Sequence, residues 1–386
     1  MEKIRDKGEG SIFQRKDGTW ISEYRIGKKS NGRPNVKSFS GKSKSEVKNK
    51  LKEFKYDMIK NDFNEVKKIT VKEYINDWLY NIKINELKPK SFDRDEGIIK
   101  NQIYKYIADI QIGNLKINDI QQLMNTLIAQ GYSYATIRKT YDILNSCFKL
   151  GIIKKEINGN PCVGVSLPKK LMVNYSKDVT FFNDNEIEVI CKESVFKCKN
   201  GNMRYRLGHS IILLLFTGMR ISELLGLKWE NVNFDKKTIK ISRSIVQVKN
   251  RSDNAKTNYK LLEQNSTKTD SSNRVIPLNQ KALAALKEIQ KINANSKYVM
   301  SNSYNKITYH QNIDDMFRKI LKRCSIKPCG VHSLRHTFAS MLFRKGVNVK
   351  TVSVLLGHSD VSITYNTYIH LIKEQEQEAV ALLDEF

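Results

Sequence analysis

The sequence lacks the features that mark several large classes of protein. Six cysteines scattered over 386 residues do not form the dense framework of a disulfide-stabilised secreted domain, so a reducing cytoplasm is expected. No stretch approaches the roughly 20 continuous apolar residues of a membrane span, so none is expected. The first ten residues have no apolar segment of the kind found in secretory signals.

Acidic residues are scarce relative to basic ones. The 40 Asp and Glu stand against 67 Lys and Arg, which gives a formal net charge of +27 and a pI near 9.7. Such a field attracts polyanions. Because 40% of the residues are hydrophobic, enough for ordinary cores, nucleic acid is the leading partner. A merely Lys-rich soluble protein has the same composition, so charge alone does not decide.

Residues 1–65 predict a small sheet followed by a helix. Residues 20–26 and 36–39 alternate as strands do, turn signals surround them, and residues 43–56 have a helical period. Between Lys28 and Lys52 nine basic residues accompany one acid, Glu46. A small basic sheet can read a DNA groove, although a solvated charged face gives the same pattern. The candidate DNA contacts here are Arg15, Lys16, Trp20, Tyr24, Arg25, Lys28, Lys29, Arg33 and Lys37.

Residues 66–168 predict a bundle of four amphipathic helices. Capping residues at Thr70, Ser91 and Ser133, and the pair at 118–119, each precede an apolar helical stripe. Short connections between such helices favour a bundle. Arg138 and Lys139 lie away from the apolar stripe of the last helix, which makes them further candidates for DNA contact.

Residues 169–386 predict a mostly helical domain with a small antiparallel sheet. Residues 238–241 alternate like a strand, and residues 274–278 could be the partner strand. The polar stretch 249–266 between them is expected to be a long mobile loop. The expected fold class is therefore multidomain and mainly α, with a sheet-plus-helix module, a helical bundle and a mixed α/β domain.

Three short strings in this last segment carry the side chains of chemical interest. In TGMRISELL, Arg220 falls in the first turn of a helix, where a cation makes sense if an anion binds beside it. A salt bridge to Glu223 is the alternative reading. In HSLRH, His332, Arg335 and His336 share one helical face because they are three and four residues apart, although a solvated polar face would look the same.

The third string is LLGHSDVSITYNTYIH. Gly357 is a natural helix C-cap, and His358 then projects just past a helix end. Tyr365 and Tyr368 follow on a short predicted helix, where either ring could simply pack. Each of the three strings, taken alone, is weak evidence for a function.

Together, the order of these residues resembles the catalytic domain of the tyrosine recombinases, the family of phage and conjugative-transposon integrases. The strings TGMRISELLGLKW, HSLRHTFAS and LLGHSDVSITYNTY carry the resemblance, with a tyrosine ten residues after the Gly-His histidine. It covers roughly residues 175–386. The middle segment resembles the core-binding domain of the family by architecture, and the first segment looks like its arm-binding domain.

The resemblance implies a site-specific recombinase that cuts and rejoins DNA without ATP. Tyr368 would attack a phosphate, forming a 3′-phosphotyrosyl link and freeing a 5′-hydroxyl. Arg220, Arg335 and His358 would hold that phosphate. A phenol with a pKa of about 10 needs help to lose its proton, and His332 would be the general base or its helper.

The resemblance also implies roles for a lysine and an acidic residue, on shorter sequence matches. The family protonates the leaving oxygen from a Lys on a β-hairpin, and Lys268 fits that place, although Lys256, Lys260 and Arg274 lie close in sequence. Glu223 would orient the arginines without contacting the phosphate itself.

Two further side chains keep alternative readings. Tyr365 is the rival nucleophile, and the ten-residue spacing favours Tyr368. His336 stands where the family carries no catalytic group, which suggests packing or a supporting role.

The expected partners follow from the resemblance. They are double-stranded DNA at core and arm sites, three further copies of the chain in a tetramer on DNA, an excisionase and host architectural proteins. The free protein could be a monomer, in the bacterial cytoplasm at the nucleoid. The tail, residues 374–386, could dock on a neighbouring subunit or on its own chain.

No cofactor and no metal is expected. Cys324, Cys329, His332 and His336 are metal-ligand residue types, but two residues separate the pairs where a zinc finger needs about 12. Two other functions stay open. A type IB topoisomerase shares this chemistry, and a catalytically silent DNA-binding regulator could keep the fold.

Overall fold

The computed structural model describes residues 10–28, 33–61, 69–168, 180–252, 255, 257–265 and 273–369. The chain forms two compact units, residues 1–88 with 94–175 and residues 89–93 with 176–386. The fold class expected from the sequence is confirmed, since helices dominate and the sheets are small and antiparallel. Within the described residues, no helix is long and apolar enough to cross a bilayer.

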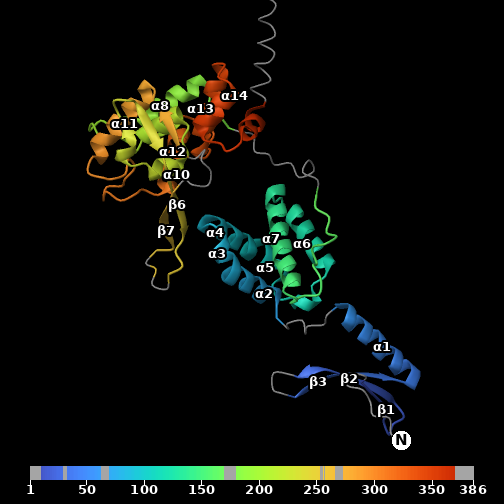
Figure 1. Cartoon of the computed structure of the whole chain (residues 1–386). Helices are drawn as coiled ribbons and strands as arrows, with labels where there is room; N and C mark the ends of the chain where they lie inside the picture. Colours follow the sequence, from blue (N-terminus) through green and yellow to red (C-terminus); the bar gives the residue numbers. More distant parts are fainter. Residues whose placement is uncertain are drawn as a thin grey trace, which may run out of the picture. The chain divides into compact units, whose positions relative to one another are not determined.

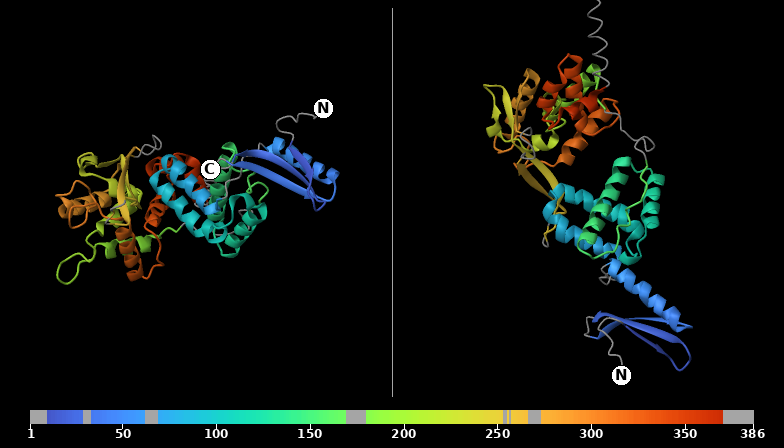
Figure 2. Two further views of the ribbon diagram at one scale, coloured as in Figure 1. Left: turned by 90° about the horizontal axis from the view of Figure 1, so that it is seen from below. Right: turned by 45° about the vertical axis from the view of Figure 1, so that its right-hand side comes forward.

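The first module is an antiparallel sheet in the order β1-β2-β3 with one helix packed on it (Figures 1 and 2). The strands are β1 (Ser11–Gln14), β2 (Trp20–Lys28) and β3 (Pro34–Gly41), and the helix is α1 (Lys44–Asn61). The aromatic ring of Phe54 on α1 lies 5.2 Å from Phe39 and 6.1 Å from Tyr24, centroid to centroid. The side of the sheet that bears Tyr24 therefore faces the helix.

The next module is the expected helical bundle, and two of its helices contain π-helical turns. The first runs through α2 (Val71–Asp77), η1 (Trp78–Lys83) and α3 (Ile84–Glu86). The second runs through α4 (Pro89–Ile98), η2 (Ile99–Ile103) and α5 (Tyr104–Ile107), and a short turn, η3 (Ile112–Asn114), follows. The others are α6 (Ile117–Ala129) and α7 (Tyr134–Ile153).

The capping predictions for the bundle have mixed outcomes. Thr70 and Ser133 accept hydrogen bonds from the first turns of α2 and α7, as expected. The prediction for Ser91 is wrong, because α4 begins two residues earlier at Pro89, whose fixed φ suits the first helical position. Likewise α6 begins at Ile117, and Asp119 accepts from the backbone N–H of Lys116.

The second unit is built around α9 (His209–Thr217), which packs against α8 (Asp184–Ser194), α11 (Gln280–Asn293) and α13 (His332–Arg344). Apolar side chains surround α9 on nearly every side, so the helix belongs in the core. The other elements are α10 (Ile221–Gly226), η5 (Trp229–Asn231), α12 (His310–Arg323), α14 (Val349–Leu356) and the helical residues 361–369.

Two small sheets complete this unit. One has the order β4-β5-β8, with β4 (Val232–Asn233), β5 (Thr238–Ile241) and β8 (Arg274–Pro277), which confirms the predicted strand pair. The other is a hairpin of β6 (Arg243–Lys249) and β7 (Tyr259–Asn265), which projects from the unit in Figure 1. The prediction of a mobile loop over 249–266 is therefore wrong in part. The strand β6 buries Ile245 and Val248, which are three residues apart, so it lacks the two-residue alternation by which a strand is recognised in a sequence.

Candidate active site

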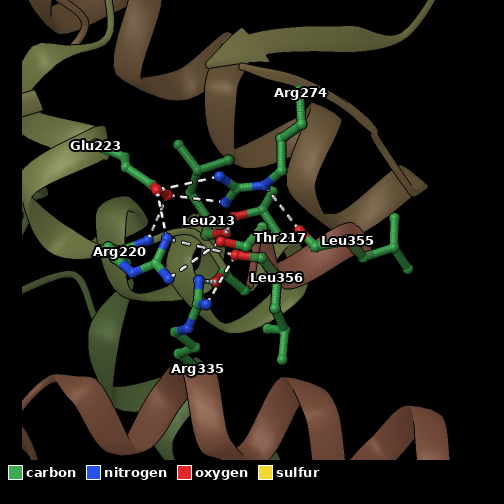
Figure 3. A network of polar contacts seen from close by, with 10 residues as sticks. Leu213, Thr217, Arg220, Glu223, Arg274, Arg335, Leu355 and Leu356 are labelled. Atoms are coloured by element: carbon green, nitrogen blue, oxygen red, sulfur yellow. Dashed lines mark hydrogen bonds and ion pairs between the residues drawn. The ribbon is translucent and has the colours of Figure 1, made fainter. Parts of the chain in front are cut away.

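Two arginines, Arg220 and Arg274, pair with Glu223 in α10, and a third, Arg335, joins the same network through a shared carbonyl (Figure 3). Arg220 is the N-cap residue, and the carboxylate of Glu223 accepts its backbone N–H at 2.8 Å and its guanidinium at 2.9 Å. Arg274, which begins β8, donates from both terminal nitrogens to the two oxygens of Glu223, at 3.0 and 2.8 Å. The salt bridge weighed as an alternative for Arg220 thus exists, as part of a larger network.

Arg335 approaches Arg220 from α13. The side chain of Arg335 is buried and donates to the carbonyls of Gly218 at 2.8 Å and Leu356 at 2.7 Å. Arg220 donates to the same Leu356 carbonyl at 3.5 Å and to that of Gly357 at 3.3 Å. One carbonyl at the end of α14 is therefore shared by both guanidinium groups, and a helix C-terminus stabilises cations.

Two glycines make these turns possible. Gly218 ends α9 with φ of +61°, and a Cβ there would lie 2.3 Å from the ring of Phe338. Gly357 ends α14 with φ of +65°, and a Cβ there would lie 2.7 Å from Arg274. Residues with a side chain disfavour this left-handed region. Glycine thus allows the chain to present carbonyls to the arginines at both places.

His358 follows directly after the α14 turn. The Nδ1 atom of its ring lies 2.7 Å from the hydroxyl of Thr364, which is buried on the helical segment 361–369. The backbone N–H of His358 donates to Ser353, and the Leu355 carbonyl accepts from Nε of Arg274. His358 is therefore anchored to the arginine network on one side and to the tyrosine-bearing segment on the other.

Tyr368 lies on that same segment, one turn beyond Thr364. Its side chain is 1% exposed, whereas Tyr365 is 39% exposed. The phenol oxygen lies 2.7 Å from Nδ1 of His336, and the ring packs against Phe343 with centroids 5.4 Å apart. Burial raises the pKa of Tyr368, and the charge of Arg335 opposes that rise. The phenol is therefore neutral in this arrangement.

His332 contacts His336 rather than the phenol. The two imidazole rings meet edge to face with centroids 4.9 Å apart, as residues one turn apart on α13 can. Partial burial lowers the pKa of His332 to about 4, and His336, Arg335 and Arg220 add to the shift. Burial followed by Arg335 and Arg220 lowers the pKa of His358 to about 4 as well.

Burial is the main cause of both shifts, and excess positive charge adds to them. Burial by itself raises the pKa of Glu223, but Arg274 and Arg220 lower it to about 2. This single carboxylate faces Arg220, Arg274 and Arg335, so cationic charge is left over. Burial and Arg220 lower the pKa of Arg335, although a guanidinium stays protonated in proteins. An anion placed between Arg220 and Arg335 would balance this field.

The candidates for the hairpin lysine have different outcomes. Lys268 and Lys256 lie outside the described residues, between the ends of described elements. Lys260 is exposed on β7. Arg274 is buried, and its guanidinium is committed to Glu223 and Leu355. It therefore acts within the protein and does not face a leaving group.

The predicted DNA-contact residues lie outside this site. Trp20 and Tyr24 alternate on β2, and Lys44 and Lys55 of α1 stack over their rings, so both aromatics are engaged with the helix. Arg25 is exposed, and because it follows Tyr24 directly in β2 its side chain lies on the other side of the sheet. Its partner in β3 is Val36. The structure describes Arg15, Lys16, Arg33 and Lys37 as exposed, whereas Lys29 and the side chain of Lys28 lie outside the described part.

The two basic residues of α7 form ion pairs within the bundle. Arg138 pairs with Asp142 at 3.1 Å, and Lys139 pairs with the buried Asp95 at 3.0 Å. Both side chains still reach the surface. Their contact with DNA stays a prediction.

Sequence reasoning missed or underrated three residues that the structure places in the site. Arg274 was considered only as a rival lysine position, His336 only for packing or a supporting role, and Thr364 was not considered. The i, i+4 spacing of His332 and His336 did predict their shared face. By contrast, no local pattern shows that Arg274 pairs with a glutamate 51 residues earlier.

Comparisons with known proteins identify the family of the chain. The sequence matches the phage integrase family over residues 181–375 and the phage integrase N-terminal SAM-like domain over residues 70–128. It is 32% identical over 380 residues to a "Tyrosine recombinase XerC-like" protein of Caldanaerobacter subterraneus, covering 93% of this chain and 94% of that protein. It is 24% identical over 290 residues to the transposase of transposon Tn916 from Enterococcus faecalis, covering 69% and 68%.

Solved structures share the fold. The Tn1549 transposon integrase, in complex with circular intermediate DNA, superposes with a TM-score of 0.63 at 20% identity over 81% of this chain and all of that one. A lambda integrase tetramer bound to a Holliday junction has a TM-score of 0.58 at 14% identity, over 94% of this chain and 96% of that one.

Proposed function

This chain belongs to the phage integrase family and is a tyrosine recombinase, and from that premise we propose the roles of its residues in cutting and rejoining DNA. The reaction exchanges strands at specific sites during integration and excision of a mobile element. Its substrate is a phosphodiester, and its intermediate is a 3′-phosphotyrosyl bond. Because that bond conserves the energy of the phosphodiester, religation needs no nucleotide cofactor.

The phosphate would sit beside Arg220 and Arg335. The supporting observation is the carbonyl of Leu356, which accepts from both guanidinium groups and lies two residues before His358. Arg335 uses two of the five N–H donors of its guanidinium on carbonyls. The remaining donors suit the non-bridging oxygens, where charge builds in the transition state. His358, oriented by Thr364, would donate a third hydrogen bond.

Tyr368 would be the nucleophile, and Lys268 would protonate the leaving 5′-oxygen. Tyr368 shares its helical segment with Thr364 and so is tied to His358, whereas Tyr365 is exposed. His332 would help the base and would not act as the base itself, because it contacts His336 and not the phenol. Glu223 and Arg274 would fix the two phosphate-binding arginines.

The roles of the modules follow the same family logic. Residues 1–65 would bind arm-type DNA sites, and residues 66–168 would bind the core site. Residues 169–386 would cleave the DNA at that core site. In the first module, Arg25 is exposed on β2, at the alternation opposite to that of Tyr24. We assign arm contact to Arg25 and to the basic residues Arg15, Lys16, Lys28, Lys29, Arg33 and Lys37, with Trp20 and Tyr24 supporting it from the helix side.

The active assembly would be a tetramer on two DNA duplexes, by analogy with the lambda integrase tetramer bound to a Holliday junction. An excisionase and host architectural proteins would set the direction of the reaction in the cytoplasm, on nucleoid DNA. Removing residues 1–65 should leave cleavage of a short core site intact and weaken integration at sites with distal arms. Unchanged integration would reject the arm assignment.

The experiment that tests the proposed function compares plasmids with and without the attachment site, and it measures both recombination and relaxation of supercoils. A plasmid with the attachment site should recombine with a second such plasmid, and a plasmid without a site should keep its supercoils. Relaxation of the site-free plasmid would indicate a topoisomerase. Binding with neither cleavage nor relaxation would indicate a silent regulator. For Lys268→Ala, a 5′-bridging phosphorothioate should restore cleavage, because a thiolate leaves without a proton.

A further inference from the structure

We propose that His336 is a catalytic residue that receives the phenolic proton of Tyr368 when this tyrosine attacks the phosphate. The inference rests on the proposed function, since it takes Tyr368 as the nucleophile. It assigns the base to a histidine that no resemblance pointed to. The geometry carries it, because Nδ1 of His336 lies 2.7 Å from the phenol oxygen, well within the reach required of a general base.

The surroundings make His336 the acceptor. Among the described residues, this is the only hydrogen bond that reaches the phenol oxygen. A neutral imidazole holds one proton, and with that proton on Nε2 the Nδ1 atom accepts from the phenol. Burial, and then Arg335, lowers the pKa of His336, which keeps the ring neutral and its Nδ1 lone pair free near neutral pH.

The groups facing this pair explain why the proton does not move early. Burial raises the pKa of Tyr368 and lowers the pKa of His336, so an ion pair of phenolate and imidazolium is unfavourable before DNA binds. Phe343 covers the phenol, while Arg335 and His332 are the charged or titratable neighbours of the imidazole. The free enzyme therefore holds its nucleophile in an unreactive form.

DNA would change that balance. A phosphate bound to Arg220 and Arg335 brings negative charge, which offsets the cation that weakens His336 as a base. At the same time, bonding to phosphorus draws charge away from the phenol oxygen. Proton transfer thus becomes favourable only as the new bond forms. This arrangement would confine nucleophile activation to subunits that hold a phosphate in place.

The step balances in atoms and charge. The Tyr368 oxygen forms a bond to phosphorus, the bond from phosphorus to the 5′-oxygen breaks, and the phenolic proton moves to Nδ1 of His336. The leaving oxygen takes a separate proton, which we assign to Lys268. In religation the 5′-hydroxyl attacks phosphorus and returns its proton to Lys268, while the phenolate leaves and recovers its proton from the imidazolium of His336.

The experiment measures single-turnover formation of the covalent complex on a nicked core site. His336→Asn keeps an acceptor oxygen near the position of Nδ1 but cannot hold the proton, so its rate should fall by about 10²–10³-fold. His336→Gln serves as a second variant. His310→Asn, at the exposed start of α12, is the matched control and should cleave at the wild-type rate.

A more acidic nucleophile separates proton transfer from packing. With a trifluorotyrosine incorporated at position 368, the loss caused by His336→Asn should shrink to within about tenfold. A wild-type rate for His336→Asn would overturn the proposal. So would an equal loss with both tyrosines, which would mean that His336 only packs. If wild type forms its adduct elsewhere than Tyr368, the proposed nucleophile fails, and the role of His336 fails with it.

Discussion

The two sides of the active site are built differently. On the phosphate side, Arg220, Arg335 and Arg274 are held by a buried carboxylate and by carbonyls from α9 and α14, each through several hydrogen bonds. On the nucleophile side, Tyr368 is held by one hydrogen bond and by packing. The difference indicates that the phosphate site is formed before DNA arrives, whereas the nucleophile is held close by in a neutral, unreactive form until a phosphate binds.

The largest effect should come from the nucleophile side. Tyr368→Phe removes the attacking oxygen, so covalent complex formation should fall by at least about 10⁴-fold while specific DNA binding persists. Gel analysis of a nicked core site measures the adduct. Tyr365→Phe is the matched control, since that ring is exposed, and it should cleave normally. The reverse pattern would move the nucleophile to Tyr365.

The next largest effect is expected on stability, and measuring it tests whether the phosphate side is formed before DNA binds. Glu223→Gln leaves the guanidinium groups of Arg220 and Arg274 without their buried carboxylate, which should lower the free energy of unfolding by about 3 kcal/mol. Glu263→Gln is the control, because Glu263 also bonds Lys228 and Arg243 but is about one-third exposed, and it should cost less than about 1 kcal/mol. Chemical denaturation measures both. Equal losses would argue against a special role for burial.

The buried carboxylate of Glu223 also predicts how the stability of the protein depends on pH. The pKa of Glu223 lies near 2 in the folded chain and near 4.5 when unfolded, so its contribution is present above pH 4.5 and is lost as pH falls toward 2. Wild type should therefore lose more stability than Glu223→Gln across that window. Parallel curves for the two proteins would contradict the assignment.

A smaller effect is expected at Arg274, which touches no substrate. Arg274→Lys keeps the charge but loses the two-pronged contact with Glu223. Cleavage should slow by about tenfold, with little change in affinity for DNA. Arg274→Ala should be slower still and less stable. A loss of affinity without a loss of cleavage rate would show that Arg274 contacts DNA instead.

The smallest effect is a proton uptake on binding. The arginines help to lower the pKa values of His332 and His358 to about 4, and a bound phosphate would offset those charges. Core DNA should therefore bind with net uptake of protons between pH 4 and 6.5, and more tightly as pH falls there. Calorimetry in two buffers of different ionisation enthalpy measures it. Proton release would contradict an anion beside these histidines.

The sequence predicted most of the architecture because much of its information is local. The caps at Thr70 and Ser133, the helical stripes and the strand pair β5 and β8 are set by neighbouring residues. The β6–β7 hairpin escaped prediction because neither strand alternates strictly: β6 buries Ile245 and Val248, which are three residues apart, and the apolar Leu261 and Leu262 of β7 are adjacent. Local pattern failed at Ser91 too, where Pro89 already begins the helix.

In the site, the family strings located the residues but not their partners. Glu223 was expected to orient the arginines, and the structure adds Arg274 as its principal partner, from a strand distant in sequence. The bond from His336 to Tyr368 spans 32 residues and depends on how segment 361–369 packs on α13. Such contacts follow from tertiary packing, which no periodicity encodes.

The most direct test of the shared phosphate site is a crystal structure of the Tyr368→Phe protein bound to an uncleaved core site. We predict guanidinium nitrogens of Arg220 and Arg335 and a ring nitrogen of His358 within about 3.2 Å of the oxygens of one phosphate. The ring at position 368 should face that phosphate. If the scissile phosphate instead meets only one of these side chains, the shared site proposed for them does not exist.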